Sequence, residues 1–304
     1  MKKKQGVIIT KSSSAKAVFC AALGNIIWGF SFLFSKVALS IVPDPNVMLA
    51  HRFILATLIM IGFILAGKGK LSFQGKDWKP AALLMLMMVC YYLFETQSLR
   101  HTNATVTGTV LAVVPVATIG TGVLFLREYP TRRQMLFCIM PVAGVIIMTV
   151  SGQELGIIST LGIVFLILCM LASAGYKTVN RKMATQFSSF ERTFLILSAS
   201  AVFFSIIGMT AVDWDVAAFV APLLQGKYLI SVLCLSVLCS ITANLLVNYA
   251  ANNMSVFKLS SFGSLSTLCS AIAGVIFLQE PVSISMLLGI VLILVGIREV
   301  TKQK

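Results

Sequence analysis

Polar side chains recur at every fourth position within a long apolar stretch in the second half of the sequence. This spacing places them on one face of a helix, and the members of the stripe are Ser240, Asn244, Asn248 and Asn252. A second stripe in the first half consists of Tyr92, Thr96 and Arg100. Polar groups inside a bilayer are costly and usually face a cavity or a partner helix. The stripes therefore indicate either two walls of one substrate cavity or hydrogen bonds that hold helices together.

Three charged side chains fall within apolar segments. Glu95 is the acid that lies well inside such a segment, whereas the other acids fall in loops or at segment ends. A carboxylate there could exchange protons or hold a substrate ammonium, or it could extend toward the surface or pair with a neighbouring cation. Arg52 and Lys177 are interpreted as snorkelling side chains, whose charged groups reach the bilayer surface.

Aromatic residues near the stripes complete a candidate substrate site. Trp28, Tyr176 and Tyr249 could add aromatic surface, although each is equally consistent with packing. The predicted substrate-binding residues are Trp28, Tyr92, Glu95, Thr96, Tyr176, Asn244, Asn248 and Tyr249.

Two glutamates occupy corresponding places in the two halves of the chain. Glu128 precedes Thr131 and Glu280 precedes Ser283, and Thr and Ser are typical helix N-caps. Negative charge stabilises the positive start of a helix dipole. We therefore expect each glutamate to stabilise the start of the helix that follows it.

The sequence has none of the residue patterns that catalysis or metal binding usually require. It contains only two histidines, His51 and His101, and neither an HExxH nor a GxSxG motif. The seven cysteines are scattered through apolar stretches without a CxxC pair. We therefore expect no catalytic residue, no metal and no cofactor, and the chain is not predicted to be an enzyme.

The composition is typical of a membrane protein. Apolar residues make up 58% of the 304 positions and charged residues only 11%, whereas charged residues are about a quarter of a soluble domain. The net charge of +14 comes from cations in short connections beside apolar stretches, as the positive-inside bias predicts, and not from a nucleic-acid-binding surface. The expected partners are the lipid bilayer and a small-molecule substrate, with no nucleic acid.

Ten apolar stretches are long enough to span a bilayer, since a span needs about 20 residues. They lie near residues 16–39, 46–66, 78–99, 103–126, 131–150, 156–180, 190–212, 227–250, 254–278 and 283–296. Lys and Arg concentrate in alternate connections, including the N-terminal tail, the loop after residue 66 and the C-terminal tail, and Arg192 and Lys258 are assigned to such loops. This pattern predicts a multi-pass protein of the cell membrane with both termini cytoplasmic.

The chain contains a weak internal repeat. Residues 125–128, Phe-Leu-Arg-Glu, align with residues 277–280, Phe-Leu-Gln-Glu, and the same shift aligns Gly144 with Gly296. Because five spans per half is an odd number, the second half must enter the bilayer from the opposite side. Such inverted repeats suit alternating access. The predicted fold is an all-α integral membrane bundle of ten helices, formed by two inverted five-helix repeats at residues 16–150 and 156–300.

Several motifs occur in the order found in one transporter family. They are Trp28-Gly29-Phe30 with Lys36, Arg52-Phe53-Ile54-Leu55-Ala56, Pro115 and the twin Phe-Leu-x-Glu segments. In these motifs nearly the whole chain resembles the EamA-type drug/metabolite transporter family. The resemblance implies a ten-helix bundle around a central substrate cavity, commonly used to export amino acids or other metabolites. The second half departs from the pattern, with Thr267 where the first half has Pro115 and Ala174 where it has Trp28.

The predicted function is therefore a transporter that exports amino acids or related amphipathic compounds by alternating access. The alternatives are a small-molecule channel or facilitator and a polytopic membrane enzyme. Saturable flux would separate a carrier from a channel, and product formation would identify an enzyme. Transport is either facilitated or coupled to protons, and the sequence makes no prediction of the oligomeric state.

Overall fold

The computed structural model describes residues 15–72, 74–101, 110–111, 113–150, 159–278 and 284–302. Every regular element in these ranges is a helix. Eight helical stretches among the described residues are long and apolar enough to cross a membrane, which confirms the membrane class. The two other predicted spans correspond to a shorter apolar stretch, Val114–Leu126, and to the helix Arg132–Val150. The count of ten spans stays a prediction.

The first half of the chain begins with three long helices. The described elements of this half are α1 (Ala15–Leu39), α2 (Pro45–Leu65), α3 (Trp78–His101), α5 (Val114–Thr121), the π-helical turn η1 (Gly122–Leu126) and α6 (Arg132–Val150). The start of α2 follows from its sequence, because Asp44 accepts a hydrogen bond from the Asn46 amide at 2.7 Å and Pro45 occupies the first helical position.

The second half contains a similar series of helices with more interruptions. Its elements are α7 (Thr160–Met183), α8 (Ser189–Thr210), α9 (Val216–Val220), η2 (Ala221–Leu224), α10 (Gly226–Cys234), the π-helical η3 (Leu235–Thr242), α11 (Ala243–Asn253), α12 (Val256–Ser261), α13 (Gly263–Leu278) and α14 (Ile284–Lys302). Together α10, η3 and α11 form one continuous membrane-spanning stretch.

Some predicted boundaries were wrong. The sixth span continues through Met183, so that Arg181 and Lys182 lie in the last turn of α7 instead of a loop. Cations at this position complement the negative end of the helix dipole, which explains why the helix includes them. The predicted ninth span is interrupted at Phe262, between α12 and α13. The last helix continues to Lys302, beyond the predicted end at residue 296.

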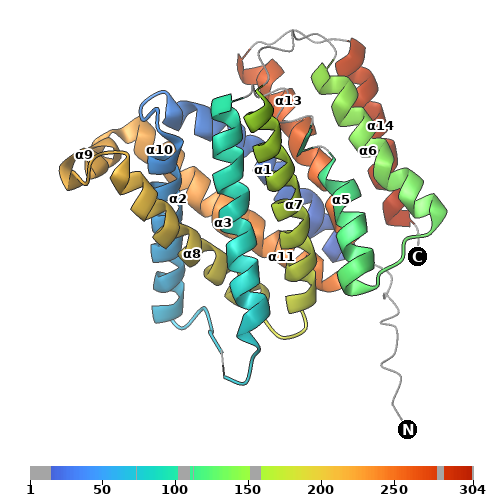
Figure 1. The fold of residues 1–304 in the computed structure, drawn as a ribbon, viewed down its shortest axis with the longest axis horizontal. Coiled ribbons are helices and arrows are strands. Elements are labelled where there is room, and N and C mark those ends of the chain that lie inside the picture. The colour runs from blue at the N-terminus through green and yellow to red at the C-terminus, as the bar shows by residue number, and fades with distance from the viewer. Residues whose placement is uncertain are drawn as a thin grey trace.

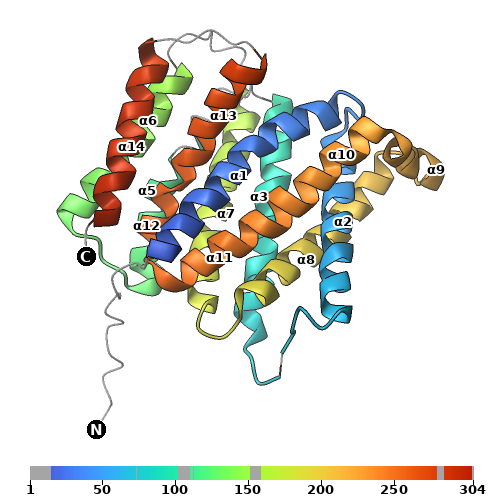
Figure 2. The ribbon, with the colours of Figure 1, turned by 180° about the vertical axis from the view of Figure 1, so that it is seen from behind.

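The main helix pairs join one half of the chain to the other. In Figure 1, α7 lies between α3 and α5, and in Figure 2, α1 lies between α11 and α13. The helix α2 packs along α8, and α6 packs along α14. Helices with the same place in the two halves therefore have corresponding neighbours, as a two-fold arrangement of the halves requires.

Two glycines that align in the sequence allow α6 and α14 to approach closely. A Cβ atom at Gly144 would lie 2.7 Å from the carbonyl oxygen of Gly289. A Cβ atom at Gly296 would lie 2.5 Å from Cδ of Pro141. Small residues at such contacts let helix backbones pack together in a membrane.

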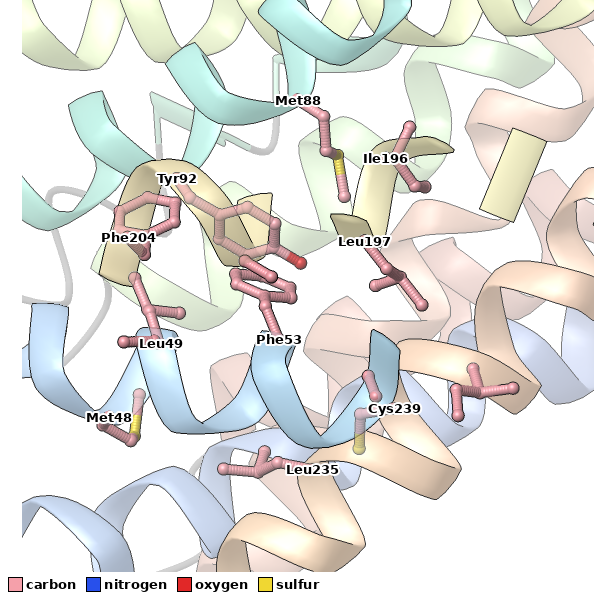
Figure 3. Close-up of a cluster of buried hydrophobic side chains, with 14 of the residues drawn as sticks. Met48, Leu49, Phe53, Met88, Tyr92, Ile196, Leu197, Phe204, Leu235 and Cys239 are labelled. Atoms are coloured by element: carbon pink, nitrogen blue, oxygen red, sulfur yellow. The ribbon is translucent and has the colours of Figure 1, made fainter. Parts of the chain in front are cut away.

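A buried apolar cluster holds α2, α3, α8 and η3 together. Figure 3 shows Tyr92 beside Phe53 and Phe204, with Leu197 and Cys239 on the neighbouring elements. The Tyr92 ring lies 5.0 Å from the Phe53 ring and 6.4 Å from the Phe204 ring, measured between centroids, and both pairs meet edge to face. This packing fixes the helix faces that carry the polar side chains described next.

Candidate functional site

Arg192 lies at the centre of a buried hydrogen-bond network between α7, α8 and α11. Its guanidinium donates to the backbone oxygen and to Oδ1 of Asn180, both at 2.7 Å, and to the Asn248 carbonyl at 2.9 Å. It also donates to Oδ1 of Asn252. Arg192 was predicted to lie in a loop, but the structure buries it completely. Oxygen acceptors from three helices replace water around the charge and make this burial possible.

Asn248 extends the network from α11. Its Oδ1 accepts a hydrogen bond from Asn180 at 2.7 Å, and its Nδ2 donates to Oγ1 of Thr193 at 2.8 Å. Both ends of the amide are therefore used, and the side chain is fully buried. Asn180, Arg192, Thr193, Asn248 and Asn252 are called the Arg192 cluster below.

Glu128 connects the first half of the chain to the same region. Its Oε1 accepts a hydrogen bond from Nε of Arg181 at 3.3 Å, and its Oε2 accepts one from the Val256 amide at 2.9 Å. Arg181 also donates to the Ala251 carbonyl at 2.9 Å. Glu128 was predicted to stabilise the start of its own following helix, but its carboxylate binds the first residue of α12. The positive end of the α12 dipole explains this contact.

Thr131 is the N-cap that the sequence predicted for α6. Its Oγ1 accepts a hydrogen bond from the Gln134 amide at 3.2 Å, and the Gln134 side chain accepts one from the Thr131 amide at 2.9 Å. This reciprocal pair caps the helix without Glu128. The corresponding predictions for Glu280 and Ser283 lie outside the described residues.

The loop between α2 and α3 is tied to the start of α8. Glu191 accepts hydrogen bonds from Lys76 at 2.7 Å and from the Ser72 amide at 2.7 Å, and it also forms a capping box with Ser188. The start of α8 therefore lies at the end of the bundle where α2 ends. We call this the cation-rich end, because Arg181, Lys76 and the Arg192 cluster lie there.

Arg52 forms a second polar centre, in the first half of α2. Its Nε donates to Oγ of Ser240 at 2.7 Å, and its Cζ lies 5.5 Å from the Phe53 ring centroid and 5.8 Å from the Tyr92 ring centroid. Snorkelling was predicted for this side chain, but only 6% of it is exposed. The hydroxyl acceptor and two aromatic faces hold the charge inside the bundle. No described residue accepts a hydrogen bond from its two terminal nitrogens.

Glu95 lies near Arg52 on α3. Its Oε1 accepts a hydrogen bond from the Tyr91 hydroxyl at 2.9 Å, and it lies within electrostatic range of Arg52. The two groups form no direct ion pair among the described residues. Glu95, Arg52, Tyr92 and Ser240 are called the Arg52 cluster below.

Lys177 and Ser260 meet between α7 and α12. Nζ of Lys177 donates to Oγ of Ser260 at 3.2 Å, so this lysine binds a neighbouring helix instead of snorkelling as predicted. Lys258, which was predicted to lie in a loop, is part of α12 and is buried. Both corrections have the same cause, because short polar residues of the neighbouring helices accept hydrogen bonds that a sequence cannot reveal.

The structure brings five of the other predicted site residues toward the two clusters. The Tyr176 hydroxyl donates to Oδ1 of Asn244 at 3.5 Å, and Asn244 donates to the Ser240 carbonyl at 2.7 Å. The Trp28 indole donates to the Cys239 carbonyl at 2.8 Å, next to Ser240. These five residues are Trp28, Tyr92, Thr96, Tyr176 and Asn244, of which Thr96 is buried one turn from Tyr92 on α3.

Tyr249 is the predicted site residue that the structure places elsewhere. Its ring lies 5.1 Å from Nζ of Lys16 and packs with α1 and Ile290 in a separate apolar cluster. It therefore turns away from Asn248, its chain neighbour. The side chain of Arg100, the last member of the first stripe, lies outside the described residues.

Sequence reasoning missed Asn180 and misplaced Arg192. The available signal was the pair Ser188 and Glu191, which matches the capping-box pattern. That pattern begins the helix at residue 189 and places Arg192 in its first turn, not in a loop. Asn180 has no comparable signal, because its partners are far away in the sequence.

An apolar groove of about 410 Å³ lies between α2 and α8, on another face of these helices. It is lined by Ile54, Thr57, Leu58, Ala201, Val202, Ser205 and Ile206. None of these is a predicted substrate-binding residue, and Leu58, Val202 and Ile206 are exposed. Exposed aliphatic side chains on membrane-spanning helices are suited to lipid contact. Among the described residues, no group of His, Cys, Asp or Glu is arranged to hold a metal ion.

The comparisons with known proteins agree with this fold. The EamA-like transporter family matches residues 15–150 and 160–301. The uncharacterized transporter YcxC of Bacillus subtilis is 31% identical over 293 residues, covering 95% of this chain and 94% of that protein. An uncharacterized transporter of Archaeoglobus fulgidus is 23% identical over 288 residues, covering 93% of this chain and 96% of that protein.

A protein of known crystal structure shares the fold. It aligns with a TM-score of 0.79 and 15% identity, covering 96% of this chain and 99% of that chain. At this identity the likeness concerns the fold alone. The family match over both halves confirms the resemblance found in the sequence motifs. The chain is a membrane transporter and belongs to the EamA-like transporter family.

Proposed function

We propose that this transporter exports amino acids or related small amphipathic compounds by alternating access between two inverted repeats. The observation that carries the proposal is the hydrogen-bond closure of the cation-rich end, at one end of a polar stripe within the bundle. The stripe begins at Ser240 beside Arg52 and continues through Asn244 to Asn248 and Asn252 in the Arg192 cluster. A carrier needs such a path, closed at one end at a time.

The pairing of helices between the halves supports the inverted-repeat part of the proposal. The pair α1 with α13 corresponds to α7 with α5, and α1 with α11 corresponds to α7 with α3. Inverted repeats related in this way can exchange their conformations, which would open the cation-rich end and close the other. The distribution of cations supports placing this end, and both termini, on the cytoplasmic side of the cell membrane.

Hydrogen bonding between helices is the other explanation of the stripe. In this conformation all four stripe residues do bond neighbouring helices or their own backbone. The two explanations are compatible if the bonds at Asn248 and Asn252 break when the cation-rich end opens. They differ in what substitution of Asn244 should do, because Asn244 lies between the two clusters.

Metabolite profiling of the growth medium tests the proposed function. Cells that overproduce the wild-type protein should accumulate one or more small metabolites in the medium, with saturable export. Asn244→Leu should abolish that export without lowering membrane abundance, since it adds apolar bulk without charge. Asn253→Leu is the matched control, because Asn253 is exposed on the same helix and its side chain donates only to Tyr249 of that helix.

Each alternative function has its own outcome in this experiment. Non-saturable flux would favour a channel, and a chemically altered product would favour a membrane enzyme. Equal export by wild-type and Asn244→Leu cells would assign the stripe to helix packing and contradict the proposed pathway. Flux measured with and without a proton gradient would separate proton-coupled from facilitated transport.

A further inference from the structure

Arg52 and Glu95 carry opposite charges at similar depths in the bundle. Arg52 lies seven residues after the start of α2 at Pro45, and Glu95 lies six residues before the end of α3 at His101. At about 1.5 Å per residue, each lies roughly 10 Å from a helix end. The contact between the Phe53 and Tyr92 rings joins the two helices beside these residues.

Separate partners hold the two charges apart. Ser240 accepts the hydrogen bond from Nε of Arg52, and Tyr91 donates a hydrogen bond to Glu95. The Tyr92 ring lies beside the Arg52 guanidinium and one turn from Glu95 on α3. Opposite charges attract strongly when they are shielded from water, so a separated pair inside a bundle is unfavourable unless another group lies between them.

We propose that Arg52 and Glu95 bind the two ends of a zwitterionic substrate. The carboxylate of the substrate accepts hydrogen bonds from the terminal nitrogens of Arg52, which no described residue uses, and Glu95 accepts hydrogen bonds from its ammonium group. Two parallel N–H···O bonds are the strongest arrangement available to arginine and a carboxylate. This inference rests on the proposed function and specifies its substrate class.

The surroundings of the pair favour a zwitterion with an apolar side chain. Phe53 and Tyr92 place aromatic faces beside Arg52, and Tyr91 lies beside Glu95. Aromatic rings of this kind exclude water from both charges, which strengthens charge-assisted hydrogen bonds. They also provide a surface for an aliphatic or aromatic substituent.

Binding of matched ligands to the purified transporter in detergent tests the inference. The ligands are L-leucine and L-phenylalanine, the amide of each, which lacks the carboxylate, and the deaminated acid of each, which lacks the ammonium. At least one zwitterion should bind the wild-type protein about tenfold more tightly than either of its analogues, because each lost group removes a charge-assisted hydrogen bond.

Two variants should lose opposite parts of this preference. Arg52→Gln should bind a zwitterion and its amide equally, and Glu95→Gln should bind a zwitterion and its deaminated acid equally. Glu299→Gln is the control, since Glu299 pairs with Lys302 on α14, outside both clusters, and it should keep the wild-type preference. If Arg52→Gln fails to fold, Glu95→Gln and the wild-type ligand series still decide the question.

The inference is overturned if no zwitterion binds better than its analogues, or if each variant weakens all ligands alike. A protein that exports other metabolites and binds none of the zwitterions would retain the proposed function and lose only this substrate class. A protein that binds zwitterions with the expected preference but exports nothing would retain the site and lose the proposed function.

Discussion

Each half of the chain places an arginine near the start of its second helix, and the two arginines differ in how many partners they have. Arg192 on α8 donates to four oxygen acceptors from α7 and α11. Arg52 on α2 donates to one hydroxyl and otherwise lies against aromatic rings. Because the start of α8 meets the end of α2, through Glu191 and the loop before α3, the two arginines lie toward opposite ends of the bundle.

This difference shows that a repeated scaffold can hold unequal sites. The helix pairs of the two halves correspond, yet one arginine completes a closed network and the other keeps its terminal nitrogens without a partner among the described residues. We infer that the cation-rich end is closed in this conformation and that the Arg52 cluster is the part prepared for substrate. In the alternative conformation, the two regions should exchange these properties.

Removal of the Arg192 side-chain charge should have the largest effect. Arg192→Met fills a similar volume but leaves the oxygens of Asn180 and Asn252 without a donor, and each orphaned acceptor costs about 1–3 kcal/mol. Thermal unfolding in detergent should show a clearly lower Tm than that of the wild type.

Arg52→Met is the matched comparison for this variant. It removes only one side-chain hydrogen bond, to Ser240, so its Tm should fall by less than that of Arg192→Met. An equal decrease in the two variants would contradict the difference between the two arginines. A larger decrease in Arg52→Met would reverse it.

Glu128→Gln should have a smaller effect on stability. The amide oxygen can still accept a hydrogen bond from the Val256 amide, whereas the ion pair with Arg181 is lost. Both partners are partly exposed, so the pair is worth at most about 1 kcal/mol. The closed end should nevertheless open more often, which the reactivity of a cysteine at Thr178 toward a membrane-impermeant thiol reagent would report.

The control for that measurement is Glu299→Gln, which removes an ion pair on α14 away from the Arg192 cluster. In a cysteine-free background, Glu128→Gln should accelerate labelling of Thr178→Cys from the cation-rich side, and Glu299→Gln should not. Unchanged labelling in both variants would show that the contact of Glu128 does not contribute to the closure.

The sequence predicted the membrane class and the stripe on α11 because both follow from the composition and periodicity of a single segment. The stripe is formed by one helix, and its spacing is sufficient to place Asn244 and Asn248 on one face. The capping sequence at Ser188 likewise carries its own signal within the chain. These features are local, so that the distant parts of the fold do not alter them.

The partners of the buried cations could not be predicted in the same way. Arg52 meets Ser240 and Glu128 meets Val256 across distances in the sequence that no periodicity connects. General knowledge of snorkelling therefore gave the wrong environment for Arg52. The orientation of Tyr249 was unpredictable for a similar reason, since only the packing of α1 against α11 turns its ring away from Asn248.

A reversible cross-link across the cation-rich end tests the central claim most directly. The hydroxyl oxygens of Thr121, at the end of α5, and Thr178, on α7, lie 2.7 Å apart and join the two halves beside Arg181. In a cysteine-free background, the double variant Thr121→Cys and Thr178→Cys would be treated with a short bifunctional methanethiosulfonate, and export of the metabolite identified by profiling would be measured. The account predicts that cross-linking stops export, that reductant restores it, and that each single variant is unaffected by the reagent. Export by the cross-linked protein at the rate of the untreated protein would contradict alternating access through this end.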